Sequence, residues 1–205
     1  ILAASLTAGA SAQVTYAEEQ NSDNVHGGDQ AVNIEWTNSW ASGMDAGFDR
    51  ASSDGSTHWV VEGSTDYTLH WWAKEGTTAD RVEIRVAEFD ASNNHIQDLA
   101  DHQTNVTSDW TEFTYSFTTS ANTTNINVRW WPWNTGGSSF YLDDVSLVKD
   151  SDSSEVTISN PGFEEWGGNL EDGPTDWRAF AAGGAEVLVT RVTVTTDVTN
   201  WEIYH

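Results

Sequence analysis

Apolar and polar residues alternate along much of this chain, and this two-residue period constrains the fold more than any other feature. In residues 125–133, Ile126, Val128 and Trp130 share one face of a strand, because strand side chains point alternately to its two faces. The residues on the opposite face are Asn127, Arg129, Trp131 and Trp133. We expect further strands at residues 12–18, 31–36, 67–74, 80–90, 110–118 and 139–148. Turn residues separate these stretches and no clear 3.6-residue period occurs, so the sequence predicts an all-β, antiparallel sandwich.

Residues 67–74 and 80–90 also predict which side chains face the core and which face outward. In residues 80–90, Val82, Ile84 and Val86 alternate with Glu83, Arg85 and Ala87. In residues 67–74, Leu69 and Trp71 fall on one face, while His70 and Trp72 fall on the other. A Thr-Gly-Gly-Ser turn joins residues 125–133 to 139–148, which predicts that those two strands form a hairpin.

Composition excludes several classes of partner. The 205 residues carry 32 acidic and eight basic side chains, a formal charge of −24, which argues against nucleic acid because phosphate binding needs concentrated positive charge. Cysteine is absent, so disulfides and thiolate metal sites are excluded. The sequence contains no run of about 18 apolar residues, so it predicts no membrane-spanning helix. Such acidity suits a protein exposed to salt, which screens its self-repulsion.

Three strand motifs resemble a known family. The ending FYLDDVSLVK (140–149) is similar to the last strand of the β-sandwich carbohydrate-binding modules that accompany bacterial xylanases, glucanases and other polysaccharide hydrolases. YTLHWWAK (67–74) and WTEFTYSFT (110–118) are similar to two earlier strands of those modules, in the same order. The resemblance covers roughly residues 10–149 and implies a jelly-roll sandwich of the galactose-binding-like kind.

The family's usual first strand is missing from that stretch and occurs later in the chain. Its NPGFE motif stands at residues 160–164, and residues 181–194 parallel residues 6–20. Residues 1–149 therefore look like a module that lacks its first strand, and residues 150–205 look like the first strands of a second module. The opening residues are then the interior of a module, although Ala10-Ser11-Ala12 also imitates a signal cleavage site.

A sandwich without its first strand has an open edge that invites strand addition. Residues 155–163 are expected to fold back on 140–149 through residues 150–153, or to pair with a neighbouring chain. Residues from 187 onward would duplicate a strand already present, and a head-to-tail donation that does not close would give a filament. A fragment of a tandem array and a signal remnant followed by a small extra domain remain open alternatives.

No catalytic site is predicted. Adjacent carboxylates such as Asp143-Asp144 occur by chance in so acidic a chain, and neighbours on a strand point to opposite faces. The chain has no HExxH or GxSxG motif, and its six histidines lack metal-ligand spacing. We therefore expect no enzyme activity from this chain.

A structural calcium ion is implied by the resemblance. In modules of this family such an ion often sits where the glutamate of NPGFE meets the first aspartate of the DDV sequence, which here are Glu164 and Asp143. Carboxylate oxygens are ligands that Ca²⁺ prefers, and two adjacent carboxylates repel each other unless a cation lies between them. The alternative is that both are solvated loop residues.

Sugar contact is expected on the outward faces of the strands. Pyranose rings stack on indoles, while charged and amide groups bind the hydroxyls. The candidate residues are His70, Trp72, Arg129, Trp131 and Trp133. Trp72 and Trp131 are expected to line one groove across neighbouring strands. The predicted function is non-catalytic polysaccharide binding outside the cell or on its surface. The alternative is a structural subunit of an extracellular filament that assembles by strand donation with calcium.

Overall fold

The computed structural model of the chain describes residues 13–36, 45–50, 58–77, 82–99, 102–132, 138–167, 174–182 and 186–190. These residues form two sheets. Sheet A contains, in spatial order, β14 (Glu186–Thr190), β1 (Gln13–Glu19), β2 (Ala31–Trp36), β11 (Ser138–Lys149), β5 (Asp66–Glu75) and β9 (Thr111–Thr118), with β12 (Ser154–Glu155) paired to β11. Sheet B contains β13 (Trp177–Ala182), β3 (Asp45–Arg50), β10 (Asn125–Pro132), β6 (Val82–Phe89) and β7 (His95–Asp98), with β4 (Trp59–Val60) on β10 and β8 (His102–Thr104) on β6.

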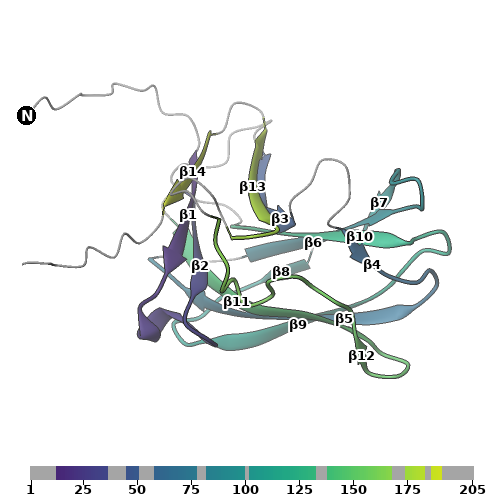
Figure 1. The fold of residues 1–205 in the computed structure, drawn as a ribbon, viewed down its shortest axis with the longest axis horizontal. Coiled ribbons are helices and arrows are strands. Elements are labelled where there is room, and N and C mark those ends of the chain that lie inside the picture. The colour runs from purple at the N-terminus through teal and green to yellow at the C-terminus, as the bar shows by residue number, and fades with distance from the viewer. Residues whose placement is uncertain are drawn as a thin grey trace, which may run out of the picture.

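The two sheets pack as the layers of an antiparallel β-sandwich, with β5, β9 and β11 in one layer and β6 and β10 in the other (Figure 1). Among the described strands, only the β1–β14 pair is parallel. A short 3-10 turn, η1 (Ser22–Asn24), is the one helical element of the described residues, and none of those residues forms a helix with the length and apolar character of a membrane span. The all-β sandwich of jelly-roll type expected from the sequence is confirmed.

The predicted inward faces form the core. The residues concerned are Tyr67, Leu69, Trp71 and Ala73 on β5, Val82, Ile84 and Val86 on β6, and Ile126, Val128 and Trp130 on β10, none of them more than 2% exposed. Burial of this much apolar surface from both sheets is the main force that holds the layers together. The alternation read from the sequence therefore sorts the two faces of these strands correctly.

The expected hairpin between β10 and β11 is wrong. β10 pairs with β3, β4 and β6 in sheet B, whereas β11 pairs with β2, β5 and β12 in sheet A. The chain therefore crosses from one layer to the other between the two strands. The turn residues between them are compatible with either connection, and alternation alone does not say which strands pair.

The C-terminal segment completes this sandwich within the same chain. β12 folds back on the end of β11, with Val148 opposite Glu155, and the backbone N–H of Val145 donates to the carbonyl of Pro161 at 2.9 Å. Phe163 of the NPGFE motif is fully buried, and its ring centroid lies 4.9 Å from that of Trp177. The expected fold-back is therefore seen at residues 154–156, which pair with residues 147–149, whereas residues 157–163 form no strand.

A separate second module is not seen in the described residues. β12 and β14 belong to sheet A and β13 belongs to sheet B, so these strands extend the same sandwich as residues 13–149. β14, the expected duplicate strand, lies at the edge of sheet A beside β1 (Figure 1).

Candidate functional site

The predicted sugar-contact residues lie on two different sheets. His70 and Trp72 are on β5 of sheet A, and Arg129 and Trp131 are on β10 of sheet B. The expectation that Trp72 and Trp131 line one groove across neighbouring strands is therefore wrong, because their strands lie in opposite layers. The structure describes the backbone of Trp131 but not its side chain, and Trp133 lies outside the described residues.

The outward face of sheet B brings together polar residues of β6 and β10. Arg129 lies directly opposite Arg85, and Trp131 directly opposite Glu83, so each pair shares one face of the sheet. Glu83 is fully buried and Asn127 is 3% exposed, although both alternate with core residues and so belong to the outward face. These side chains form a polar patch on the outward face of sheet B, in which Glu83 and Asn127 are buried.

Two ion pairs fix the position of the Arg85 guanidinium in this polar patch. Its Nη2 lies 3.6 Å from Oε1 of Glu83, and its Nη1 lies 3.6 Å from Oδ2 of Asp98 on β7. A guanidinium held between two carboxylates is pre-oriented, which lowers the entropic cost of binding a ligand.

One row of sheet B concentrates basic residues. The strand registers place Arg178, Asp49, Arg129 and Arg85 in a line across β13, β3, β10 and β6. Three of the chain's eight basic residues therefore fall in a single row of a protein whose net charge is −24. Arginine donors such as Arg85 and Arg129 suit the hydroxyls of a sugar.

The outward face of sheet A shows Trp72 already stacked on a residue of the protein. The imidazole of His26 lies over its indole, with centroids 3.7 Å apart and an interplanar angle of 14°. His26 Nδ1 also lies 2.7 Å from Oδ2 of Asp144. His70 contacts Glu112 on β9, Nδ1 to Oε1, at 3.0 Å. Both predicted residues of β5 therefore have partners within the fold, and the sequence did not single out His26.

The predicted calcium residues Asp143 and Glu164 both contact the loop of residues 26–30, and Asp143 lies at a bulge in β11. The register of β11 with β5 shifts between Asp143 and Ser146, and Asp144 has a φ of 45°. The Asp143 carboxylate is fully buried, and its Oδ2 accepts from the backbone N–H groups of His26 (2.9 Å) and Gly27 (3.2 Å). Burial, together with the nearby charge of Asp144, raises the pKa of Asp143 to about 7, against the lowering effect of these hydrogen bonds.

Glu164 lies on the other side of the same site. Its carboxylate accepts from the backbone N–H groups of Asp29, at 3.1 Å, and Gln30, at 3.3 Å. A Cβ on Gly162 would lie 3.2 Å from Oδ1 of Asp144 and 3.8 Å from Oδ1 of Asp143, so the carboxylates surround this glycine.

The loop of residues 26–30 wraps these carboxylates closely. A Cβ on Gly27 would collide with Asp144, and one on Gly28, whose φ is +65°, would collide with Glu164. Beside Glu164, the buried side-chain oxygen of Gln30 has no hydrogen-bond partner among the described residues.

These features fit a hard cation such as Ca²⁺, which takes carboxylate, amide and backbone oxygens. No three acidic or histidine side chains of the described residues stand close enough to hold a metal by themselves. An ion held by Asp143 and Glu164 would therefore need further oxygen ligands, and the unpartnered Gln30 oxygen is a candidate for one of them.

Comparisons with known proteins find likeness at the level of structure. No protein-family model and no curated protein matches the chain. Among solved structures, a family 4 carbohydrate-binding module is 14% identical over 60% of this chain and 74% of its own, with a TM-score of 0.44. The family 11 carbohydrate-binding module of a cellulosomal cellulase from Clostridium thermocellum is 12% identical over 69% and 84%, with a TM-score of 0.47.

A viral protein belongs to the same set of similar structures. The enzymatically active domain of tailspike protein 4 from bacteriophage CBA120 is 11% identical over 66% of this chain but only 18% of its own, with a TM-score of 0.51. At these identities the likeness is one of fold, an antiparallel β-sandwich.

Proposed function

We propose that this protein binds a polysaccharide outside the cell, without catalysis, through the outward face of sheet B. The observation that carries the proposal is the polar patch on β6 and β10, where Arg85 and Arg129 lie opposite each other and are both half-buried. Charged and amide groups held on a rigid sheet bind sugar hydroxyls in fixed directions. In this proposal the indoles of Trp131, a β10 residue, and Trp133, which follows β10 in the sequence, would stack on sugar rings.

The proposal assigns no sugar-binding role to Trp72, because His26 covers one face of its ring. It assigns the family-type calcium ion to Asp143, which lies at the β11 bulge in sheet A, and to Glu164. An ion there would hold residues 26–30 and the NPGFE segment together and would have a structural role.

Affinity electrophoresis through gels containing xylan, mixed-linkage β-glucan, laminarin or mannan tests the proposal. The wild type should be retarded by at least one of these polymers. Trp131→Ala and Arg129→Ala should each reduce the affinity about tenfold or more, because removal of a central aromatic or arginine contact typically costs upward of 1.4 kcal/mol.

His70→Ala is the matched control, because His70 has the same kind of outward position on the opposite sheet. Its retardation should equal that of the wild type. Equal losses in His70→Ala and Arg129→Ala, or a wild type that runs unretarded in all four gels, would refute binding through sheet B.

A second candidate function, self-association by strand exchange, is favoured by the pairing of β1 with β14. The two strands come from stretches with similar sequences, and Val14 lies opposite Val187 in the register between them. β14 is parallel to β1, and β1 is antiparallel to β2, so β14 runs in the direction that pairing with β2 requires. The β14 strand of one copy can therefore take the place of β1 beside β2 of another.

The molar mass of the chain, measured by light scattering over a hundredfold range of concentration, tests this second candidate. Strand exchange predicts dimers and larger species that grow with concentration. Val187→Pro should remove them, because proline breaks a ladder hydrogen bond. A single monomer mass at every concentration would rule out strand exchange and leave polysaccharide binding unaffected.

A further inference from the structure

Three adjoining cavities lie at one end of the sandwich, and Glu62 lines all of them. The first has a volume of about 400 Å³ and lies where β4, the start of β5 and the β11–β12 turn meet. This volume is near the lower end of the range for small-molecule sites, so the cavity suits a small ligand better than a length of polymer. None of the residues of the sheet B patch lines it.

One side of this cavity is apolar. Val60, Val61 and Val156 contribute to its lining, and Val60 is 73% exposed. An aliphatic side chain so open to water is unremarkable alone, but here it borders a cavity instead of a flat surface. Such a wall can cover the C–H face of a sugar ring.

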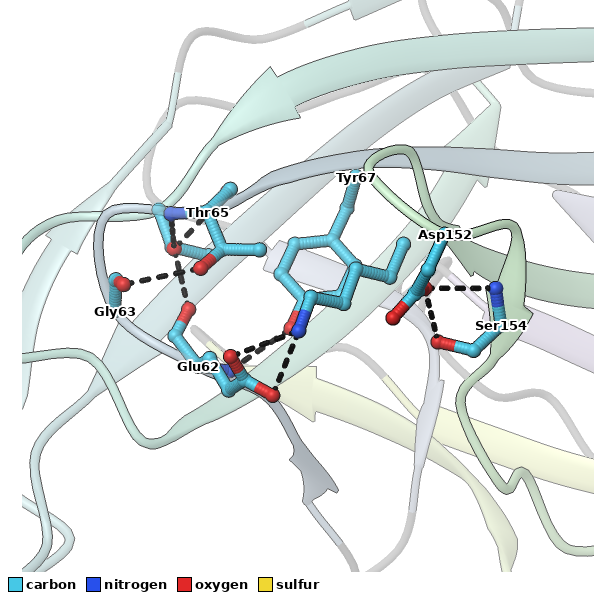
Figure 2. A network of polar contacts seen from close by, with 8 residues as sticks. Glu62, Gly63, Thr65, Tyr67, Asp152 and Ser154 are labelled. Carbon is cyan, nitrogen blue, oxygen red and sulfur yellow. Dashed lines mark hydrogen bonds and ion pairs between the residues drawn. The ribbon is translucent and has the colours of Figure 1, made fainter.

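The other side is a rigid polar network (Figure 2). Lys149 Nζ donates to both carboxylate oxygens of Glu62 at 2.8 Å, and the backbone N–H of Glu62 donates to the Tyr67 hydroxyl at 2.9 Å. Tyr67 is 2% exposed, so its ring is fixed while its oxygen reaches the cavity. That hydroxyl accepts one hydrogen bond here and keeps its own hydrogen to donate.

The turn that closes the cavity is also held in place. Asp152 Oδ1 accepts from the backbone N–H of Ser154 at 3.0 Å and from the Ser154 hydroxyl at 2.6 Å. The hydroxyl of Thr119 donates to the carbonyl of Glu62 at 2.6 Å, which fixes the opposite rim. A site whose walls are fixed before binding loses little conformational entropy when a ligand arrives.

Charge selects among small ligands. The hydrogen bonds to Glu62 raise the pKa of Lys149, which therefore stays cationic, but its charge is balanced by Glu62, and Glu155 adds a further negative charge to the lining. An anionic ligand would meet net repulsion. A neutral ligand with one apolar face and several hydroxyls matches both walls.

We infer that this cavity is a second carbohydrate site, which takes a single neutral sugar such as the terminal residue of a glycan. Val60, Val61 and Val156 cover one face of the ring, and Lys149, Glu62 and Tyr67 bind its hydroxyls. The inference goes beyond the proposed function, because it concerns glycan ends and free sugars bound at the end of the sandwich. It does not require the polar patch on sheet B.

Titration of the whole chain with free sugars, followed by nuclear magnetic resonance, tests the inference. D-Glucose, D-xylose, D-mannose and D-galactose serve as neutral probes, and D-glucuronate serves as the charged one. At least one neutral sugar should give saturable shifts of the Val60, Val61 and Val156 methyl signals, with a dissociation constant on the order of millimolar. D-Glucuronate should bind more weakly than glucose.

Two variants locate the binding. Lys149→Met keeps the length of the side chain and removes its ammonium group, and Val60→Asp places a charge on the apolar wall at an exposed position that folding tolerates. Each should weaken the binding tenfold or more. Lys74→Met is the matched control: Lys74 is the chain's other lysine, and it donates to the Asp23 carbonyl and to Asn24 on the outward side of sheet A. Its affinity should stay unchanged.

The absence of saturable shifts with all four neutral sugars would overturn the inference. So would equal affinity in Lys149→Met and wild type, or saturation of the same signals by Ca²⁺ alone. Because free sugars are measured one by one, failure of polymer retardation in the gels does not affect this result.

Discussion

The imidazole of His26 and the indole of Trp72 stack at 3.7 Å with planes 14° apart, so a loop residue covers a tryptophan of sheet A. This stack and the 2.7 Å contact of His26 with Asp144 tie residues 26–30 to β5 and β11. The loop that carries Gly27 and Gly28, beside the proposed calcium ligands, is therefore anchored by an aromatic contact. Trp72, which the sequence suggested as a sugar-stacking residue, stacks on a residue of the protein instead.

Replacement of His26 by Ala should expose Trp72 to water. We expect a red shift of the tryptophan emission and a loss of about 1–2 kcal/mol in the free energy of unfolding, because an aromatic pair and a side-chain contact are both removed. Urea unfolding curves measure the loss. His26→Phe keeps the stack and removes only the contact to Asp144, so it should recover most of the emission and part of the stability. Unchanged emission in both variants would mean that the stack does not form in solution.

Phe163 should be essential to the fold although it lies beyond residue 150. Its side chain is fully buried against Trp177, so Phe163→Ala should lower the free energy of unfolding by about 3–5 kcal/mol through the cavity it leaves. Thermal and urea unfolding give the difference. Val60→Ala, at a site 73% exposed, should change it by less than about 0.5 kcal/mol. A Phe163 variant as stable as the Val60 variant would show that the C-terminal segment is not part of this core.

Alternation along single strands was enough to identify the core. Leu69, Trp71, Val128 and Trp130 were placed inward from the sequence, and all four are 1% exposed or less. Burial of one strand face against the other sheet enforces a two-residue period, so the pattern survives in the sequence. The fold-back of residues 155–163 was also predicted, because the NPGFE motif was recognised out of its usual order.

The pairing of strands could not be predicted in the same way. Whether β10 neighbours β11 or β6 depends on contacts between distant residues, and a short turn allows either. Because β10 pairs with β6 and not with β11, Trp72 and Trp131 lie on different sheets. The His26 stack was missed for a similar reason, since nothing local to residue 26 indicates a partner 46 positions away.

Glu88 should contribute stability that acid removes. The side chain is fully buried at the end of β6 and accepts from the Ser120 N–H (2.7 Å) and hydroxyl (2.6 Å), from Thr123 (3.0 Å) and from Gln97 (2.8 Å). Burial alone would raise its pKa, but these hydrogen bonds outweigh burial and hold the pKa below the usual value of 4.5. The stabilisation is therefore complete above about pH 4.5 and is lost as the pH falls through the lower, folded-state pKa.

Glu88→Gln tests this account. At pH 7 the variant should be less stable by about 1–3 kcal/mol, since a neutral amide cannot accept all four hydrogen bonds. The difference in the free energy of unfolding between the variant and the wild type should become smaller as the pH is lowered from 5 to 3. Urea unfolding midpoints at several pH values measure this difference. Glu112→Gln, with a half-exposed side chain, is the control and should change little at any pH. A difference for Glu88→Gln that stays constant with pH would contradict the role of its ionised form.

Calcium should stabilise the chain through Asp143 and Glu164. Ca²⁺ at a hundred times its dissociation constant adds about 2.7 kcal/mol to the free energy of unfolding, which for a chain of this size raises Tm by about 5 °C or more. A chelator should reverse the rise. Asp143→Asn and Glu164→Gln should each remove most of it, because each replaces a charged ligand of a hard cation by a neutral amide.

The buried Asp143 carboxylate, whose pKa burial raises to about 7, is the group that gains most from a neighbouring cation, so its variant should lose the calcium response while remaining folded. Asp152→Asn, at an exposed acid of the β11–β12 turn, should keep the full response. Mg²⁺ at the same concentration controls for screening, because it has the same charge but demands a smaller, near-ideal octahedral shell and gives up its water ligands reluctantly. Equal Tm shifts with Mg²⁺ and Ca²⁺, or an undiminished calcium shift in both Asp143→Asn and Glu164→Gln, would show that the ion acts through general screening of the −24 charge and not at the β11 bulge.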